Sequence, residues 1–192
     1  MNNKKVLFLT QAALIAALYV VLTEISNIFS LASFMVQIRF SEALTILPFF
    51  IPAAIPGLFV GCIISNLLVS ANIFDIIFGS LATLIGALLT YFIGRVSSGK
   101  DTNNKTDASD ATTISAPKSR YKKAAAWFAP IPPIVANTLI IPFVLKYAYG
   151  YEPLWLFFLT IFAGEFISCG ILGMPLLFLV KKYARHLFTP DR

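Results

Sequence analysis

Long apolar runs dominate this sequence and leave few architectures open to it. They cover about residues 6–23, 43–72, 76–94, 124–145 and 154–180, and Glu165 is the only charged residue within them. Only 12% of the chain is charged, about half of the ~25% typical of soluble proteins, and 58% is hydrophobic. A soluble globule of this composition could not cover its surface with polar groups. The runs therefore predict an all-α membrane protein, and they exclude a disordered chain, a nucleic-acid-binding module and an ordinary soluble enzyme.

The run at 43–72 decides how many times the chain crosses the membrane. It is longer than the roughly 20 residues of one span, and it contains Pro48, Pro52 and Pro56. Proline removes a backbone donor and clashes with the preceding turn, so this run is either one kinked helix or a hairpin of two. With the hairpin, every Lys and Arg except Arg39 and Lys146 faces the cytoplasm, whereas a single helix would violate the positive-inside rule.

We therefore expect one six-helix domain in the cell membrane, with both termini cytoplasmic. The expected spans are about 6–25, 42–54, 55–72, 75–95, 124–146 and 154–181. The segment 96–123 is rich in Ser, Thr, Asn and Asp, which predicts a flexible cytosolic loop. A cleaved signal peptide is not expected, because no small-x-small site follows the first run.

Several kinds of chemistry are missing from the sequence. There is no GxxxxGK[ST] phosphate loop, and the only histidine, His186, lies in the basic tail. An intramembrane metal–His or Ser–His site is therefore excluded. Cys62 and Cys169 lie inside apolar runs without metal-ligand spacing, which indicates small buried side chains rather than a disulfide. We expect no enzymatic activity, no metal, no cofactor and no nucleic-acid partner.

Polar groups at membrane depth are the functional candidates, because an ionisable side chain there costs several kcal/mol unless it is paired or hydrated. In the expected topology they all fall in the outer half of the bundle, with Glu165 near the midplane. This predicts a pocket that opens outward. The candidates are Glu165, Glu42, Asn137, Asp75, Arg39 and Asn66, with Glu24 at the outer end of the first span.

Most of these groups also have a structural explanation. Asp75 opens a helical run and is equally suited to capping it. Arg39 and Glu42, three residues apart, could pair with each other at the surface, and the amides of Asn66 and Asn137 could join helices.

Glu165 is the hardest to explain without a ligand, because no basic residue lies at its depth on any span. Trp155 and Phe158 lie in the outer half of the same span. They fit either the interfacial aromatic belt or stacking on a flat ligand.

Small residues form two seams. On the first span these are Ala12, Ala13, Ala16 and Ala17, and on the third they are Gly57, Gly61 and Ser65. Small residues four apart let helices approach closely. For the glycines we favour packing within the chain. For the alanines, internal packing and docking on another membrane protein are equally plausible.

Five stretches of the sequence resemble a known family. The first span, TQAALIAALYVVLT, resembles the alanine-rich first helix of the substrate-binding S components of energy-coupling-factor (ECF) transporters. The stretches VQIRFSEALTILPFFIPAAIPGLFVGCIISNLL, DIIFGSLATLIGALLTY, PIPPIVANTLIIP and GEFISCGILGMPLL together resemble the queuosine-precursor transporter family, QueT. The similarity covers nearly the whole chain except the loop at 96–123 and the ends.

The resemblance implies a six-helix S component that captures its substrate outside a bacterial cytoplasmic membrane. A transmembrane coupling subunit and two cytosolic ATPase subunits would be its partners, with Ala12, Ala13, Ala16 and Ala17 as the docking surface. The implied ligands are 7-deazaguanine bases, either the cyano or aminomethyl precursor or queuine itself. The loop between the first two spans would cover the pocket.

A carboxylate at Glu165 or Glu42 would accept the two adjacent N–H donors of a guanine-like edge, and Asn137 or Arg39 would donate to its carbonyl. Asp75 and Asn66 would support them. Two other functions stay open: an S component for another vitamin or an amino acid, and a proton-coupled secondary transporter that uses Glu165 and Asp75.

Overall fold

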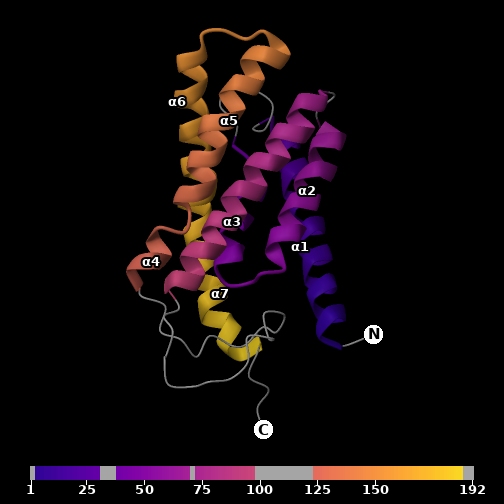
Figure 1. Ribbon diagram of the computed structural model, residues 1–192, viewed down its shortest axis with the longest axis vertical. Helices are drawn as coiled ribbons and strands as arrows, with labels where there is room; N and C mark the ends of the chain where they lie inside the picture. The colour runs from indigo at the N-terminus through magenta and orange to yellow at the C-terminus, as the bar shows by residue number, and fades with distance from the viewer. Residues whose placement is uncertain (1–2, 31–37, 70–71, 98–122, 188–192) are drawn as a thin grey trace.

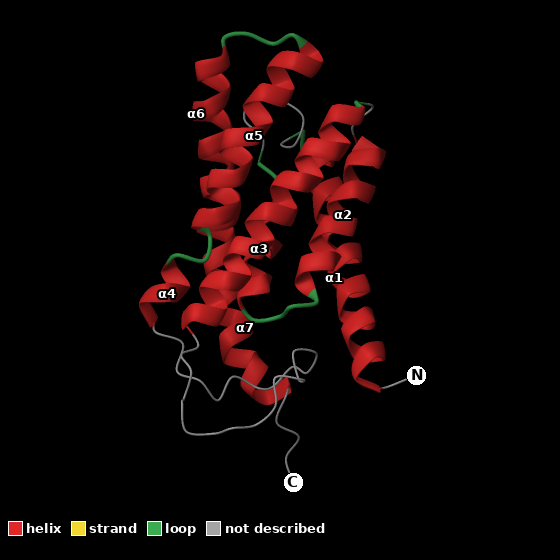
Figure 2. Cartoon of the chain, viewed as in Figure 1, coloured by secondary structure: helices red, strands yellow, loops and turns green. Residues whose placement is uncertain are grey.

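The computed structural model describes residues 3–30, 38–69, 72–97 and 123–187, and within these ranges the chain is helical and has no strands (Figure 2). This confirms the all-α prediction. The α-helices are α1 (Asn3–Ile28), α2 (Ala54–Val69), α3 (Ser80–Ser97), α4 (Lys123–Trp127), α5 (Ile131–Tyr149), α6 (Leu154–Glu165) and α7 (Gly173–Leu187) (Figure 1). Three further helical segments are the 3-10 helix η1 (Phe40–Phe49) and the π-helices η2 (Asp75–Gly79) and η3 (Phe166–Leu172).

Four helical stretches in the described part of the chain are long and apolar enough to cross a membrane. They are Asn3–Ile28, Asp75–Ser97, Ala125–Tyr149 and Leu154–Lys182, where the sequence placed four of its six spans. The third is interrupted after α4. Pro130, Pro132 and Pro133 have no N–H to donate to the preceding turn, so a new helix, α5, begins with these prolines at its N-terminus. In the fourth, η3 joins α6 to α7.

The two remaining expected spans, 42–54 and 55–72, correspond to the shorter helices η1 and α2. The chain breaks between them at residues 50–53, where the prolines allowed a kink or a hairpin and the charge distribution favoured the hairpin. At rises of about 2.0 and 1.5 Å per residue, η1 and α2 are roughly 20 and 24 Å long. Neither reaches the ~30 Å of a hydrocarbon core, so the hairpin consists of two short elements rather than two full spans.

The helix η1 lies in the interior of the bundle. Every residue from Ser41 to Phe49 is buried, and η1 contacts α1, α3, η3 and α7. Pro48 removes a backbone donor near its end, and the chain turns when Phe50 N–H donates to the Leu47 carbonyl. A segment that reads as a membrane span is therefore surrounded by protein instead of lipid.

The basic residues segregate between the two ends of the bundle. α1 begins and α7 ends at one end, where α3 also ends and α4 begins (Figure 1). Arg95, near the end of α3, and Lys181 and Lys182, in α7, belong to this end, whereas Arg39 and Lys146 belong to the other. The topology prediction requires this arrangement, and the cytoplasmic orientation of the termini stays a prediction. Residues 98–122, which form most of the expected flexible loop, lie outside the described residues.

The helices α1 and α2 pack closely along the predicted glycine seam. A Cβ atom added at Gly57 would lie 2.7 Å from the Ala12 carbonyl oxygen, and one at Gly61 would lie 2.9 Å from the Cβ of Tyr19. Only glycine allows this approach. The seam therefore packs within the chain, as we predicted for the glycines.

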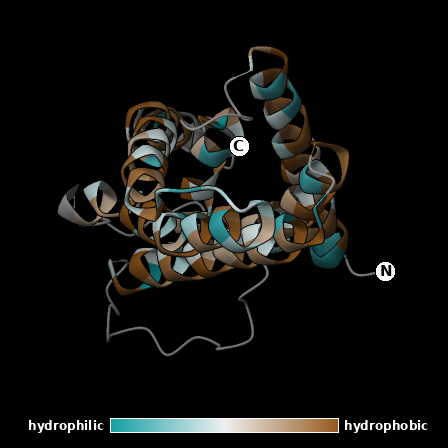
Figure 3. Ribbon diagram, turned by 90° about the horizontal axis from the view of Figure 1, so that it is seen from above, coloured by the Kyte–Doolittle hydropathy of each residue, from teal (hydrophilic) through white to brown (hydrophobic). Residues whose placement is uncertain are grey.

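The outward faces of the long helices carry large hydrophobic side chains. Examples from α1, α3 and α5 are Leu9, Leu89 and Leu139, which are 63%, 48% and 56% exposed. Viewed along the bundle axis, hydrophobic residues cover most of each helix and hydrophilic positions are sparse (Figure 3). An exposed apolar surface of this extent requires lipid around it, which indicates a multi-pass membrane protein.

Candidate functional site

Several of the predicted polar residues meet in one pocket inside the bundle. Its polar lining comes from η1, α3, α5 and α6, and its free space is about 10 Å³, room for about one water molecule. The lining residues are Arg39, Glu42, Gly79, Thr83, Asn137, Ile141, Ile161 and Glu165. The two acids are almost fully buried, at 2% exposure for Glu42 and 7% for Glu165.

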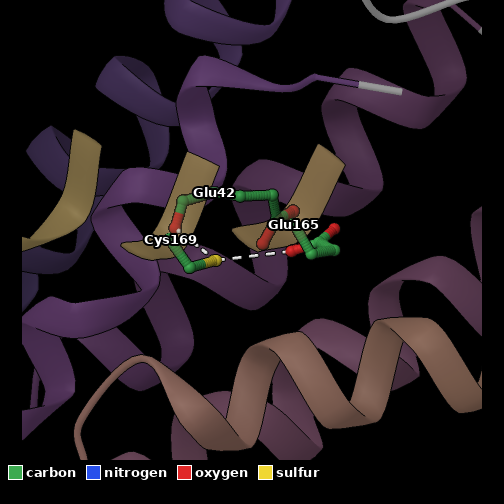
Figure 4. Close-up of side chains that lie close together, drawn as sticks. All are labelled: Glu42, Glu165 and Cys169. Carbon is green, nitrogen blue, oxygen red and sulfur yellow. Dashed lines mark hydrogen bonds between the residues drawn. The ribbon is translucent and has the colours of Figure 1, made fainter. Parts of the chain in front are cut away.

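The carboxylate of Glu165, at the end of α6, has one partner on each oxygen. The Asn137 side-chain amide donates to its Oε1 at 2.9 Å, and the Cys169 thiol donates to its Oε2 at 3.3 Å (Figure 4). Cys169 lies on η3, and its sulfur is also 3.4 Å from the backbone carbonyl of Glu42. The π-helical segment thus brings η1 and α6 together at the two acids, and π-helical turns are often found at functional sites.

The carboxylate of Glu42, on η1, is only half satisfied. The Tyr19 hydroxyl donates to its Oε1, whereas its Oε2 is buried without a hydrogen-bond partner. The Asn137 amide is also near Glu42, but its hydrogen bond goes to Glu165. An unpaired buried carboxylate oxygen is costly, so this oxygen is the group in the pocket that most requires a ligand.

Three polar side chains on one face of α1 hold η1 in place. Ser26 accepts a hydrogen bond from Phe40 N–H at 2.8 Å, Thr23 donates to Ser41 Oγ at 2.8 Å, and Tyr19 donates to Glu42. Residues 19, 23 and 26 are four and three apart, so they share one side of the helix. We call these three contacts the α1–η1 clamp.

Arg39 connects the pocket to the end of the bundle that carries Asp75. Its Nη1 donates to Asn66 Oδ1 at 3.3 Å, and the Asn66 amide donates to the backbone carbonyl of Asp75 at 3.1 Å. The Arg39 Nε is buried without a partner. Among the described residues, the Arg39 guanidinium is the only cation that lines the pocket, and it lies within electrostatic reach of Glu42 and Asp75.

Comparison with known proteins identifies the family. A family model described as "QueT transporter" matches residues 9–182. The chain belongs to the QueT transporter family. Part of it, 85 residues, is 36% identical to the queuosine precursor transporter QueT of Lactococcus lactis subsp. cremoris (strain MG1363), an alignment over 44% of this chain and 50% of that protein. The chain therefore spans about half the length of the relative it matches. No solved structure matches the chain.

Membership of the QueT family agrees with the absence of enzyme motifs, since the family consists of transport proteins. The pocket offers hydrogen-bond donors and acceptors to a small polar molecule. It provides two carboxylates as acceptors, and the Arg39 guanidinium and the Asn137 amide as donors. Thr83 adds a hydroxyl that donates to the Gly79 carbonyl at 3.1 Å and also lies 3.4 Å from Cys62 Sγ.

The remaining predicted site residues of this QueT protein lie outside the pocket. Asn66 is buried behind Arg39, and the Asp75 carboxylate accepts a 2.6 Å hydrogen bond from the Tyr149 hydroxyl near the loop before α6. Trp155 is 68% exposed on α6, and Phe158 packs edge-to-face on Phe143. Neither aromatic ring lines the pocket, whose apolar walls are Ile141 and Ile161 instead.

The four alanines of α1 divide into two pairs. Ala12 and Ala16 are each 8% exposed and face the glycine seam of α2. Ala13 and Ala17 lie about 100° further round the helix and are exposed. Only the second pair lies on a surface that a partner protein can reach, and the docking role stays a prediction.

Sequence reasoning missed Tyr19 and treated Cys169 as a buried hydrophobe. Both cysteines are buried and free, as expected. The Cys169 thiol, however, contacts the Glu42 backbone carbonyl and the Glu165 carboxylate. A signal for Tyr19 was present in the sequence. Ala12, Ala16, Tyr19, Thr23 and Ser26 form one continuous stripe of small and polar residues on α1, and all five are buried.

Replacing Tyr19 by Phe is expected to lower the free energy of unfolding by about 1–3 kcal/mol, because the buried Glu42 carboxylate loses its donor. The ring would keep its packing. Thermal melting of the purified protein in detergent measures the change. Tyr147→Phe, at a position 79% exposed, is the matched control and should melt like the wild type. Equal melting of both variants would show that the hydroxyl does not hold Glu42.

Proposed function

We propose that this chain is the substrate-capturing S component of an ATP-driven ECF importer in a bacterial cytoplasmic membrane. Its ligand would be a queuosine precursor, a 7-deazaguanine base in the aminomethyl or cyano form, or queuine. The observation that carries the proposal is the pocket itself. In a QueT-family chain, two buried carboxylates, one amide and one guanidinium surround a single space, and one carboxylate oxygen has no partner.

A deazaguanine base complements these groups. Its guanine edge presents two adjacent N–H donors that one carboxylate accepts together, at Glu165 or Glu42. Its carbonyl takes a hydrogen bond from Arg39 or Asn137. The ammonium of an aminomethyl group pairs with the second carboxylate, which otherwise leaves two like charges close together in a dry site. Asn66 supports Arg39 through their hydrogen bond.

The pocket must widen to admit such a base, since its free space is about 10 Å³ and a two-ring molecule displaces several waters. Arg39 is the side chain best able to move. It is half-buried, and its single hydrogen bond in the site, to Asn66, is long at 3.3 Å. Residues 31–37, where the expected loop over the pocket falls, lie outside the described residues.

Titration of the purified chain in detergent with guanine, queuine and the cyano and aminomethyl precursors tests the substrate class. We expect the deazaguanines to bind, and guanine to bind more weakly because it lacks the substituent at the seven position. Riboflavin and a panel of free amino acids serve as comparison ligands. Binding of one of these without any binding of deazaguanines would contradict the proposal.

The proposed partners are a transmembrane coupling subunit and two cytosolic ATPase subunits. Replacing both Ala13 and Ala17 by Leu is expected to reduce the amount of coupling subunit that co-purifies with the chain several-fold, because larger side chains prevent close approach of helices. Deazaguanine binding by the isolated chain should not change, since both positions are exposed and neither lines the pocket.

The matched control for this experiment is Ala163→Leu, at an exposed alanine of α6. It should leave co-purification unchanged. If both the Ala13/Ala17 variant and Ala163→Leu lose the coupling subunit, the loss comes from larger side chains on any lipid-facing surface and not from the α1 alanines. Proton-driven uptake by the chain alone in liposomes would instead indicate a secondary transporter.

A further inference from the structure

The two acids of the pocket lie close to the thiol of Cys169, just outside the pocket lining, and base binding does not require this thiol. One carboxylate oxygen from Glu42, one from Glu165 and the sulfur of Cys169 all lie within 4.8 Å of one another (Figure 4). All three residues are buried, at 2%, 7% and 1% exposure. We propose that these three side chains form a binding site for one thiophilic divalent cation, such as Zn²⁺, inside the QueT fold.

The unpartnered oxygen of Glu42 is the independent observation that points to a ligand. Each acid has one oxygen held by a neutral donor, the Tyr19 hydroxyl on Glu42 and the Asn137 amide on Glu165. The other oxygen of Glu42 has no partner, and that of Glu165 accepts only the weak thiol donor. In metal sites, ligating carboxylates are oriented in the same manner by hydrogen bonds on their second oxygens.

The spacing of the atoms suits a tetrahedral cation. With metal–oxygen and metal–sulfur distances of about 2.0 and 2.3 Å, neighbouring ligand atoms lie about 3.3–3.6 Å apart. The Cys169 sulfur and Glu165 Oε2 are already 3.3 Å apart. The widest pair, at most 4.8 Å apart, must close by up to about 1.5 Å. This is within reach of side-chain rotation.

The charges also balance. When the cation binds, the Cys169 thiol loses its proton to solvent, and the resulting thiolate sulfur coordinates the cation, as in other thiolate sites. Two carboxylates, one thiolate and one divalent cation leave a single negative charge, which the Arg39 guanidinium in the same pocket offsets. The thiolate selects Zn²⁺ or Cd²⁺ over the oxygen-seeking Mg²⁺ and Ca²⁺. Three protein ligands leave a fourth position open, which a water molecule or a ligand atom can fill.

Cadmium is the probe, because a cadmium–thiolate bond absorbs in the ultraviolet. The full chain is purified in detergent without substrate, and Cd²⁺ is titrated into it. We expect about one Cd²⁺ per chain, displaced by Zn²⁺ and unaffected by excess Mg²⁺. Cys169→Ser should abolish the absorption. Cys62→Ser is the matched control, since Cys62 is equally buried but contacts Asn66 and Thr83 instead of an acid, and it should bind like the wild type.

Glu42→Gln provides a second variant that keeps the thiol, and we expect it to weaken Cd²⁺ binding at least tenfold. No absorption by the wild type, absorption retained in Cys169→Ser, or unchanged affinity in Glu42→Gln would each overturn the cation site. Melting curves of the substrate-free variants confirm that each one is folded.

A competition arm separates this inference from the proposed function. The aminomethyl precursor, added to the Cd²⁺-loaded chain, should displace the cation if both use Glu42 and Glu165. If a bound precursor does not affect cadmium binding, the cation site stands and the base does not bind at Glu42 and Glu165. Precursor binding by a chain that never takes up Cd²⁺ would leave the proposed function standing and remove the cation site.

Discussion

Replacing Glu165 by Gln is expected to weaken binding of the deazaguanine base by about 10- to 100-fold. A hydrogen bond to a charged group contributes about 1.5–3 kcal/mol, and about 1.4 kcal/mol corresponds to a factor of ten in affinity. The substitution keeps the shape of the side chain but replaces an acceptor oxygen by an NH₂ donor, which would face the N–H donors of the base. Calorimetric titration of the purified variant with the aminomethyl precursor measures the loss.

Glu152→Gln is the control for this experiment. Glu152 lies in the loop between α5 and α6, is 73% exposed and pairs with Lys146 at 3.6 Å. Its replacement removes one exposed carboxylate outside the pocket lining and should leave the affinity unchanged. Wild-type affinity in Glu165→Gln would remove Glu165 from the site and leave Glu42 as the acceptor for the guanine edge.

Replacing Gly57 by Ala is expected to lower the stability of the whole bundle by about 2 kcal/mol. The added methyl would lie 2.7 Å from the Ala12 backbone carbonyl, so α1 must move away from α2 to accommodate it. For a chain of this size, about 2 kcal/mol corresponds to a fall in Tm of about 4–8 °C. Thermal melting in detergent, followed by size-exclusion chromatography, measures the change.

Gly170→Ala is the matched control, because a methyl there would lie 3.7 Å from the nearest side-chain atom, which is an ordinary contact. It should melt close to the wild type. The clamp on η1 also extends from α1, so Gly57→Ala should weaken base binding along with stability. A variant that melts at a lower temperature but binds with full affinity would show that the seam and the pocket are independent.

Composition and charge were sufficient to predict the four long apolar helices, because both follow from the energetics of a bilayer. The prolines between Pro48 and Pro56 correctly predicted the break of the 43–72 run. The 3-10 form of η1 and its place inside the bundle were not predictable. An uncharged apolar segment reads the same whether it contacts lipid or other helices, and only tertiary packing distinguishes the two.

The pocket was predictable to the extent that charge at membrane depth is rare. Glu165, Glu42, Asn137 and Arg39 were found in this way, and they line one space. For Trp155 and Phe158 the sequence left open the interfacial belt and stacking on a flat ligand, and neither ring lines the pocket, since Trp155 is exposed and Phe158 packs on Phe143. The direction of a side chain around a helix depends on how the helix packs, and the sequence of an almost uniformly apolar helix does not specify it.

The clamp and the seam together fix the rotational setting of α1. Ala12 and Ala16 occupy the contact with α2, and Tyr19, Thr23 and Ser26 occupy the contact with η1, all from the inner side of one helix. One extra residue inserted between Tyr19 and Thr23 would turn the upper half of that side by about 100°. The helix therefore tolerates new side chains on its lipid-facing side far more readily than a change in its own length.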